Sequence, residues 1–158
     1  MIEPEAGRIL VEGRDVMDTN PVALRRKIGY VIQEIGLFPN MTVAQNIAVV
    51  PKRLKYSKEE IDEITHQLLD MVDMAYEDYA HKYPWQLSGG QQQRIGVLRA
   101  LAASPPIVLM DEPFGALDPM TRHALQDEII RLHKRLKKTF VFVTHDMDEA
   151  LKLATKIV

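Results

Sequence analysis

The sequence predicts an α/β domain built on a parallel sheet. Short apolar runs alternate with longer amphipathic segments, and this alternation is typical of parallel strands joined by helices. Three compact apolar runs carry the prediction, at residues 28–32, 107–110 and 139–144. Polar side chains follow each run directly, at the position where open α/β sheets bind their ligands.

The composition is that of an ordinary globular protein. The chain has 158 residues, a net charge of −2 and no cysteine. This length supports one domain with a real core, or a large part of one. Lysine and arginine are spread through amphipathic segments, so we expect no nucleic-acid partner. The sequence has no apolar run of membrane-spanning length, and Glu3, Pro4 and Glu5 do not suit a secretion signal. We therefore expect a cytoplasmic chain with no direct membrane insertion.

The first part of the chain predicts two strands and a helix. Residues 8–11 form a short apolar strand. Asn20 is a helix cap and Pro21 suits the first helical position, so a short helix should follow. The run at 28–32 has the pattern of a buried strand, and the glycine and proline in 34–40 predict a loop.

Capping boxes predict two helices in the middle of the chain. Thr42 begins one that runs to about Val50, where we expect Pro51 to end it. Ser57 begins the other. The second helix carries apolar residues at helical spacing on one face: Ile61, Ile64, Leu68 and Val72.

The last part of the chain predicts three helices and two strands. A helix begins after Ser88 and ends near Ala103, before a Ser-Pro-Pro sequence. The runs at 107–110 and 139–144 are the strands. Asp118 caps the helix between them and Asp146 caps the last helix, through about residue 155. Residues 157–158 look like the start of a final strand.

Residues 87–94, Leu-Ser-Gly-Gly-Gln-Gln-Gln-Arg, form a helix N-terminus suited to anions. Free backbone N–H groups point outward there, and the helix dipole favours negative charge. Gly89 and Gly90 let phosphate oxygens approach the backbone, while Ser88 caps the helix. Alone, this is an ordinary capped helix. Three motifs that follow favour an anion-binding role over an ordinary helix cap: Asp-Glu-Pro at 111–113, Gly-Ala-Leu-Asp at 115–118 and Thr-His-Asp at 144–146.

In this order, with Gln33 upstream, these motifs resemble the ATP-binding subunit of an ABC transporter. The resemblance covers essentially the whole chain. It implies a P-loop NTPase-like parallel sheet with helices on both faces, and a helical subdomain. It divides the chain into a partial α/β core at 1–41, a helical subdomain at 42–88 that contacts the membrane subunit, and an α/β core at 89–158.

The resemblance also implies the residues that act on ATP and Mg²⁺. Asp111 is the expected Mg²⁺ ligand beside the phosphates, and Gln33 would bind Mg²⁺ or the attacking water. Glu112 is the expected polariser of that water. His145 would hydrogen-bond the γ-phosphate and orient Glu112.

A second group is expected to act on the nucleotide of another subunit. By resemblance, Ser88, Gly89, Gly90 and Gln91 press on the γ-phosphate that the partner's phosphate-binding loop holds. Asp118 contributes contacts across the dimer interface. Each ATP would thus be enclosed between two chains, which excludes water and completes the site.

One motif of the family is missing from the sequence. No G-x-x-x-x-G-K-[ST] loop, which cradles the phosphates, is present. We therefore expect a chain that begins after this Walker A loop and the strand before it. Such a chain would have negligible ATPase activity alone. It would also expose the edge of the strand at 139–144, which favours self-association.

Three classes of function remain to be compared. The first is the ATPase of a homodimeric importer, on permease subunits at the inner membrane face. Residues 28–43 and 109–122 look most like importers of glycine betaine, carnitine or choline, although amino-acid importers share much of them. The second is an ATPase for nucleic acid or ribosomes; Ser88 follows Gln33 by only 55 positions, which leaves no room for a long coiled coil. The third is a non-catalytic module that donates its Ser-Gly-Gly face to a complete partner.

Overall fold

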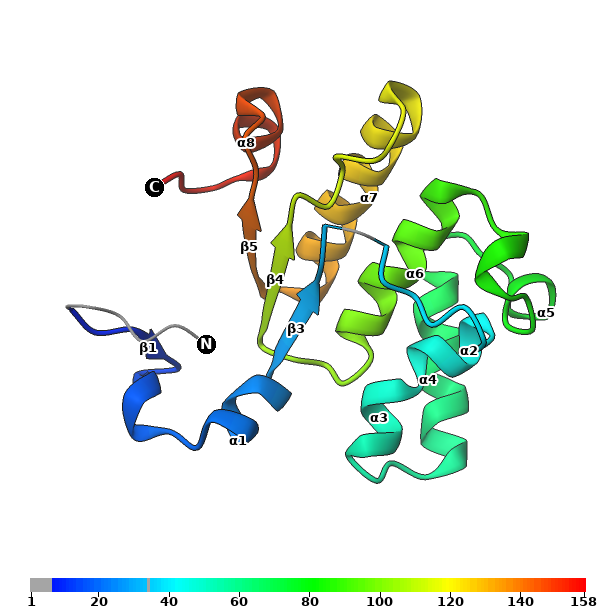
Figure 1. Ribbon diagram of the computed structural model, residues 1–158, viewed down its shortest axis with the longest axis horizontal. Coiled ribbons are helices and arrows are strands. Elements are labelled where there is room, and N and C mark those ends of the chain that lie inside the picture. Colours follow the sequence, from blue (N-terminus) through cyan, green and yellow to red (C-terminus); the bar gives the residue numbers. More distant parts are fainter. Residues whose placement is uncertain (1–6, 34) are drawn as a thin grey trace.

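A three-stranded parallel sheet lies at the centre of the computed structural model, which describes residues 7–33 and 35–158 (Figure 1). Its strands are β3 (Ile28–Val31), β4 (Ile107–Asp111) and β5 (Thr139–Val143), in the order β3-β4-β5. Both neighbouring pairs are parallel, so the expected sheet is confirmed. The predictions made on Glu3, Pro4, Glu5 and residue 34 lie outside the described residues.

Helices and a small hairpin complete the described chain. The hairpin joins β1 (Leu10–Val11) to β2 (Arg14–Asp15), and short 3-10 helices span Val16–Asp18 and Pro84–Gln86. The α-helices are α1 (Pro21–Arg26), α2 (Val43–Ile47), α3 (Val49–Arg53), α4 (Lys58–Asp70), α5 (Tyr76–Tyr79), α6 (Gly89–Leu101), α7 (Pro119–Leu136) and α8 (Met147–Leu153). Among the described helices, none has the length and apolar character needed to cross a membrane.

The two faces of the sheet differ in burial. Val31, Met110 and Phe142 lie side by side in the strand register, and the first two are buried. On the opposite face, Tyr30 and Val141 are both exposed. Side chains alternate between faces along a strand, so one face packs into the core and the other stays open in the described residues.

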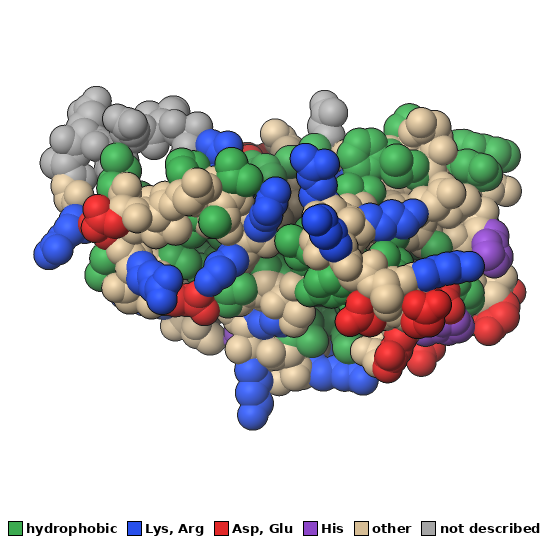
Figure 2. Space-filling model, turned by 90° about the horizontal axis from the view of Figure 1, so that it is seen from below, with side chains coloured by type: hydrophobic (Ala, Val, Ile, Leu, Met, Phe, Trp, Pro, Cys, Tyr) green, Lys and Arg blue, Asp and Glu red, His purple; other side chains and the backbone are tan. Residues whose placement is uncertain are grey.

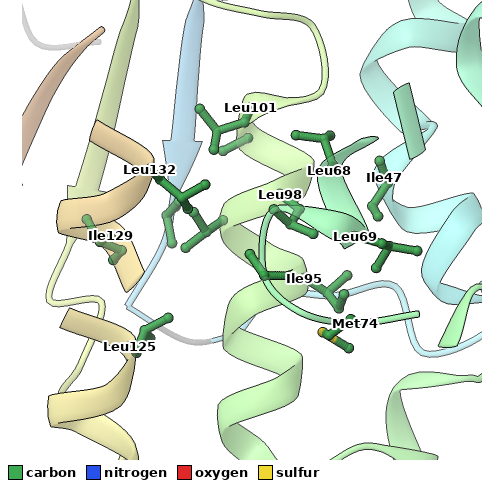
Figure 3. Close-up of a cluster of buried hydrophobic side chains, with 14 of the residues drawn as sticks. Ile47, Leu68, Leu69, Met74, Ile95, Leu98, Leu101, Leu125, Ile129 and Leu132 are labelled. Atoms are coloured by element: carbon green, nitrogen blue, oxygen red, sulfur yellow. The ribbon is translucent and has the colours of Figure 1, made fainter. Parts of the chain in front are cut away.

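Helix α6 is the centre of the hydrophobic core. It contacts β3 of the sheet and α2 of the helical segment, and α7 packs beside it. Figure 3 shows apolar side chains of α6, of α7 and of the helical segment at 47–74 pointing toward one another around α6. Those labelled are Ile47, Leu68, Leu69, Met74, Ile95, Leu98, Leu101, Leu125, Ile129 and Leu132. The sheet and helices α2 to α5 therefore share a single core through α6, with α2 to α5 gathered on one side of it (Figure 1).

The predicted helix caps are confirmed. Thr42 and Gln45 form a reciprocal capping box at α2, and Ser57 and Glu60 form one at α4. Asn20 accepts two backbone N–H bonds at the start of α1. These side chains satisfy backbone donors that no residue within the helix can reach, which is why the sequence marks the helix starts so well.

Two predictions about element ends are wrong. Pro51 does not end a helix; it lies within α3, which begins at Val49 after α2 ends at Ile47. Pro51 is the third residue of α3, and N–H groups in the first turn of a helix have no partner within that helix. A proline there, which lacks an N–H, therefore costs the helix no hydrogen bond. Residues 157–158 form no strand, and both are exposed.

Candidate functional site

Three residues that follow neighbouring strands meet at one edge of the sheet. Gln33 comes after β3, Glu112 after β4 and His145 after β5. The Gln33 Nε2 group donates a hydrogen bond of 2.9 Å to Glu112 Oε2. Glu112 Oε1 lies 3.1 Å from His145 Nδ1. Glu112 is therefore held from both sides, as expected where parallel strands end together.

The backbone of Glu112 is in the left-handed region, with φ of 42°. Its N–H donates to the Val143 carbonyl at 2.9 Å, which fixes the end of β4 against β5. Its own carbonyl accepts from Gly115 N–H at 3.2 Å. A non-glycine residue in this conformation carries strain, and such strain is concentrated at functional sites.

Asp111, the last residue of β4, has a different hydrogen-bond partner. Its Oδ2 accepts a hydrogen bond of 3.3 Å from the Tyr30 hydroxyl. Carboxylate and amide oxygens of the kind that Asp111 and Gln33 offer suit Mg²⁺. The described residues contain no cluster of three or more acidic, histidine or cysteine side chains around one point. Mg²⁺ usually keeps waters and phosphate oxygens as ligands, so two protein oxygens are compatible with it.

A hollow of about 430 Å³ lies beside Glu112. Gln33, Glu112 and His145 line it, together with Arg122, Asp146 and Glu149. The sequence interpretation included the first three and missed the others. Arg122 lies 3.6 Å from Asp146 and 3.9 Å from Glu149, as ion pairs. The hollow thus combines a hydrogen-bonded carboxylate with a guanidinium, a pairing suited to a polar, charged ligand.

The residues at the start of α6 form a separate group. Ser88 Oγ accepts from Gln91 N–H at 3.3 Å, and Gln91 Oε1 accepts from Ser88 N–H at 3.0 Å, which makes a capping box. Gly90 packs tightly against Thr121 of α7. A Cβ on Gly90 would lie 2.3 Å from Thr121 Cγ2, so glycine is required by this contact.

Asp118 caps α7 beside that group. Its Oδ1 accepts from the N–H groups of Met120 and Thr121, both at 3.1 Å. Hydrogen bonds from Thr121 hold the pKa of Asp118 below its ordinary value. Because Thr121 also touches Gly90, the starts of α6 and α7 are neighbours. Neither Asp118 nor residues 88–91 line the hollow beside Glu112.

An aromatic pair precedes the start of α6. Trp85 is 73% exposed, and its ring stacks on that of Tyr83 at a centroid distance of 6.3 Å. Trp85 lies three residues before Ser88 in the chain. This surface is therefore more apolar than the polar helix start beside it.

A second hollow, of about 410 Å³, lies between α1, β3, α3 and α6. Apolar residues such as Val22, Val49 and Ala100 line it, together with four arginines. Figure 2 shows basic side chains gathered over the middle of the face on which α1 and α3 lie. None of the residues predicted to act on nucleotide lines this hollow.

The family model described as "ABC transporter" matches residues 1–115. The chain belongs to the ABC transporter family. This match includes Gln33, residues 88–91, Asp111 and Glu112. Nucleotide binding is the family's shared property, and an ADP- and phosphate-bound cassette is among the similar structures.

Curated members of the ABC transporter family match the chain over its full length. The choline transport ATP-binding protein OpuBA of Bacillus subtilis is 64% identical over 158 residues. The osmoprotectant import ATP-binding protein OsmV of Salmonella typhimurium is 52% identical over 157 residues. The chain spans 41% of the length of each of these two relatives.

Solved cassettes of the family have the same fold. The structure of cbiO1 from Clostridium perfringens, part of the complex cbiONQ, has a TM-score of 0.86 at 27% identity. It covers 97% of this chain and 62% of that one. The dimeric bacterial ABC transporter cassette MJ0796 has a TM-score of 0.76 at 35% identity, over 96% of this chain and 68% of that one. The P-loop NTPase-like fold class is thereby confirmed. The expected cover of both sheet faces is not seen, because the face that carries Tyr30 and Val141 is exposed in the described residues.

Proposed function

We propose that this chain forms the hydrolysing part of the ATPase in an osmoprotectant importer. The observation that carries the proposal is the pair of contacts that hold Glu112 between Gln33 and His145. This arrangement suits a general base whose position and proton are both controlled. The curated relatives named for choline and osmoprotectant transport support choline, glycine betaine or carnitine as the solute class.

Each residue of the proposed site has a separate task. Asp111 and Gln33 would bind Mg²⁺, and the metal when bound would neutralise charge on the phosphates of ATP. Glu112 accepts the proton of the attacking water, while Gln33 and His145 hold its two oxygens in place. His145 is also the group that we propose for contact with the terminal phosphate.

The proposed working unit contains two copies of this chain. Ser88, Gly89, Gly90, Gln91 and Asp118 would contact the nucleotide and backbone of the partner copy. None of these residues lines the hollow beside Glu112 in its own chain, which supports this. The similar cassette described as dimeric supports it as well.

We also propose the remaining partners and the division of the chain. Permease subunits that span the membrane would bind residues 42–88, and the assembly would lie on the cytoplasmic face of the membrane. Residues 1–41 and 89–158 would form the α/β part of the cassette. The similar structure that is part of a larger transporter complex supports such partners.

A chimera tests the proposal directly. The 158 residues of this chain replace the matching 158 residues of the Bacillus subtilis choline relative. We expect the chimera to hydrolyse ATP and to support choline uptake in cells that lack the relative. Glu112→Gln should abolish both while leaving nucleotide binding intact. A folded chimera that binds ATP but whose turnover is unchanged by Glu112→Gln would contradict the proposal.

A non-catalytic role is the alternative that the sequence leaves open. Here the chain would only lend its Ser88 face to a complete subunit. Mixing the chain with an intact relative that carries a defect at the residue matching Ser88 separates the two roles. Rescue of turnover by the Glu112→Gln form of this chain would favour the non-catalytic role. Competition of choline uptake by amino acids would favour the amino-acid importer type.

A further inference from the structure

Arg122 joins two loops that carry predicted site residues. It lies on the first turn of α7, and its backbone N–H donates to the Asp118 carbonyl at 2.9 Å. Its guanidinium also donates to the Leu117 carbonyl at 3.4 Å. The same guanidinium faces Asp146 and Glu149 at the start of α8. One side chain therefore spans from the loop before α7 to the loop before α8.

The far end of this contact is a buried network around Glu149. Glu149 is buried, and its Oε2 accepts from the Thr144 hydroxyl at 2.7 Å. The Thr144 hydroxyl in turn accepts from Asp146 N–H at 3.1 Å. Arg122 supplies the positive charge that a buried carboxylate needs, since an unpaired one is costly.

His145 lies between the two residues that this network holds. Thr144 precedes it and Asp146 follows it, and both are tied to Glu149 or Arg122. The His145 ring itself is largely exposed and is tied to Glu112. Among the described residues, this ring has Glu112 as its one hydrogen-bond partner, so its direction depends on its backbone. That backbone is held in turn by Thr144 and Asp146.

We propose that Arg122 is a positioning residue that sets where the His145 ring lies. It does so by holding the Thr144–Asp146 loop against the Leu117–Asp118 loop. A change at Asp118 would thereby be transmitted to His145 within the same chain. The effect of Arg122 on turnover rests on the function proposed above, whereas its effect on the His145 ring does not.

The chain offers a matched control for this proposal. Lys152 and Asp127 form another ion pair between α8 and α7, with an N–O distance of 2.7 Å. This pair joins the same two helices but does not line the hollow. Lys152→Met should therefore reproduce any general loosening of α8 without the specific effect on His145.

The first measurement uses this chain with ¹⁵N-labelled histidine. Arg122→Met should shift the His145 ring nitrogen resonances, and Arg122→Lys should restore them in part. His66 and His81 are in the helical segment, so their resonances serve as internal references. Unchanged His145 resonances in Arg122→Met, or an equal shift in Lys152→Met, would overturn the proposal.

The second measurement is a double-mutant cycle in the chimera. Arg122→Met should lower kcat about tenfold or more with little change in KM, since small displacements near the reacting atoms are costly. Combined with His145→Ala, it should cause no further loss, because both changes remove the same group's function. Fully additive losses would overturn the proposal. An inactive chimera would contradict the proposed function instead, and the histidine resonances would still decide the role of Arg122.

Discussion

Gln33 and Glu112 are separated by 79 positions in the chain, and their side chains meet at 2.9 Å. The contact exists because β3 and β4 are neighbours and parallel, so that the residues after them leave the sheet at the same edge. Gln33 donates and the carboxylate accepts, which leaves the other carboxylate oxygen for His145. The amide therefore fixes Glu112 without neutralising it.

Gln33→Glu should disrupt this contact selectively. Two carboxylates at that distance repel, and Glu112 would lose its donor. We expect turnover of the chimera to fall about tenfold or more, as for a misplaced general base. Phosphate release measures the effect. Gln67→Glu is the control, because Gln67 donates to Glu63 at 3.1 Å on the exposed surface of α4; equal losses would count against a specific role for Gln33.

Gly90→Ala should separate the starts of α6 and α7. The added methyl group would meet Thr121 Cγ2 at 2.3 Å, and overpacking of this kind costs about 1–3 kcal/mol of unfolding free energy. Urea unfolding measures the loss. The Cβ that Gly89→Ala adds would lie in open space, so this variant should not destabilise the fold. Thr121→Ser, which removes Cγ2, should rescue Gly90→Ala; failure of that rescue would refute the clash as the cause.

Asn46→Ala should loosen the loop that precedes α2. The buried Asn46 amide accepts from Phe38 N–H at 2.8 Å and donates to the carbonyls of Phe38, Met41 and Thr42. Leaving these groups without partners should cost about 2–3 kcal/mol. Gln45→Ala removes only one exposed capping bond, and should cost less than about 1 kcal/mol. Thermal unfolding measures both losses of stability. Similar losses for Asn46→Ala and Gln45→Ala would contradict this account.

Glu128 should make stability depend on pH in an unusual direction. It is 2% exposed, and burial raises its pKa above the ordinary value, although Arg94 at 2.8 Å opposes the shift. The folded state then binds the proton more tightly than the unfolded chain. The stability contributed by protonation is therefore full below the unfolded pKa of Glu128, and is lost as pH rises through its folded pKa.

The comparison with Glu128→Gln isolates this effect. The unfolding free energy of the natural chain, minus that of the variant, should decrease as the pH rises above 4.5, the ordinary pKa of a glutamate. Urea titrations at several pH values measure it. Glu63→Gln, an exposed change on α4, should give a nearly constant difference over the same range. If the difference in unfolding free energy between the natural chain and Glu128→Gln increased with pH, the pairing of Glu128 with Arg94 would outweigh the effect of burial.

Local signals allowed most of the elements to be predicted. Caps such as Thr42, Ser57 and Asp118 act within a few residues, so the sequence displays them. The strands were also predictable, because buried runs are compact. Pro51 was misjudged because its effect depends on where the preceding helix ends, and that end is set by packing.

Long-range pairings could not be predicted from the residues alone. The motif order suggested that Gln33, Glu112 and His145 act together, but not which oxygen of Glu112 each would contact. Arg122 gave no signal at all, since an arginine on an amphipathic helix is usually solvated. Its partners lie on α8, and only the packing of α7 against α8 brings them together.

The position of Trp85 gives the chain its own optical reporter. It is the only tryptophan in the sequence, it is largely exposed, and it lies three residues before Ser88. Its fluorescence therefore comes from one known point beside the start of α6. Any partner that covers this surface should move the emission to shorter wavelengths, so docking there can be followed without an attached dye.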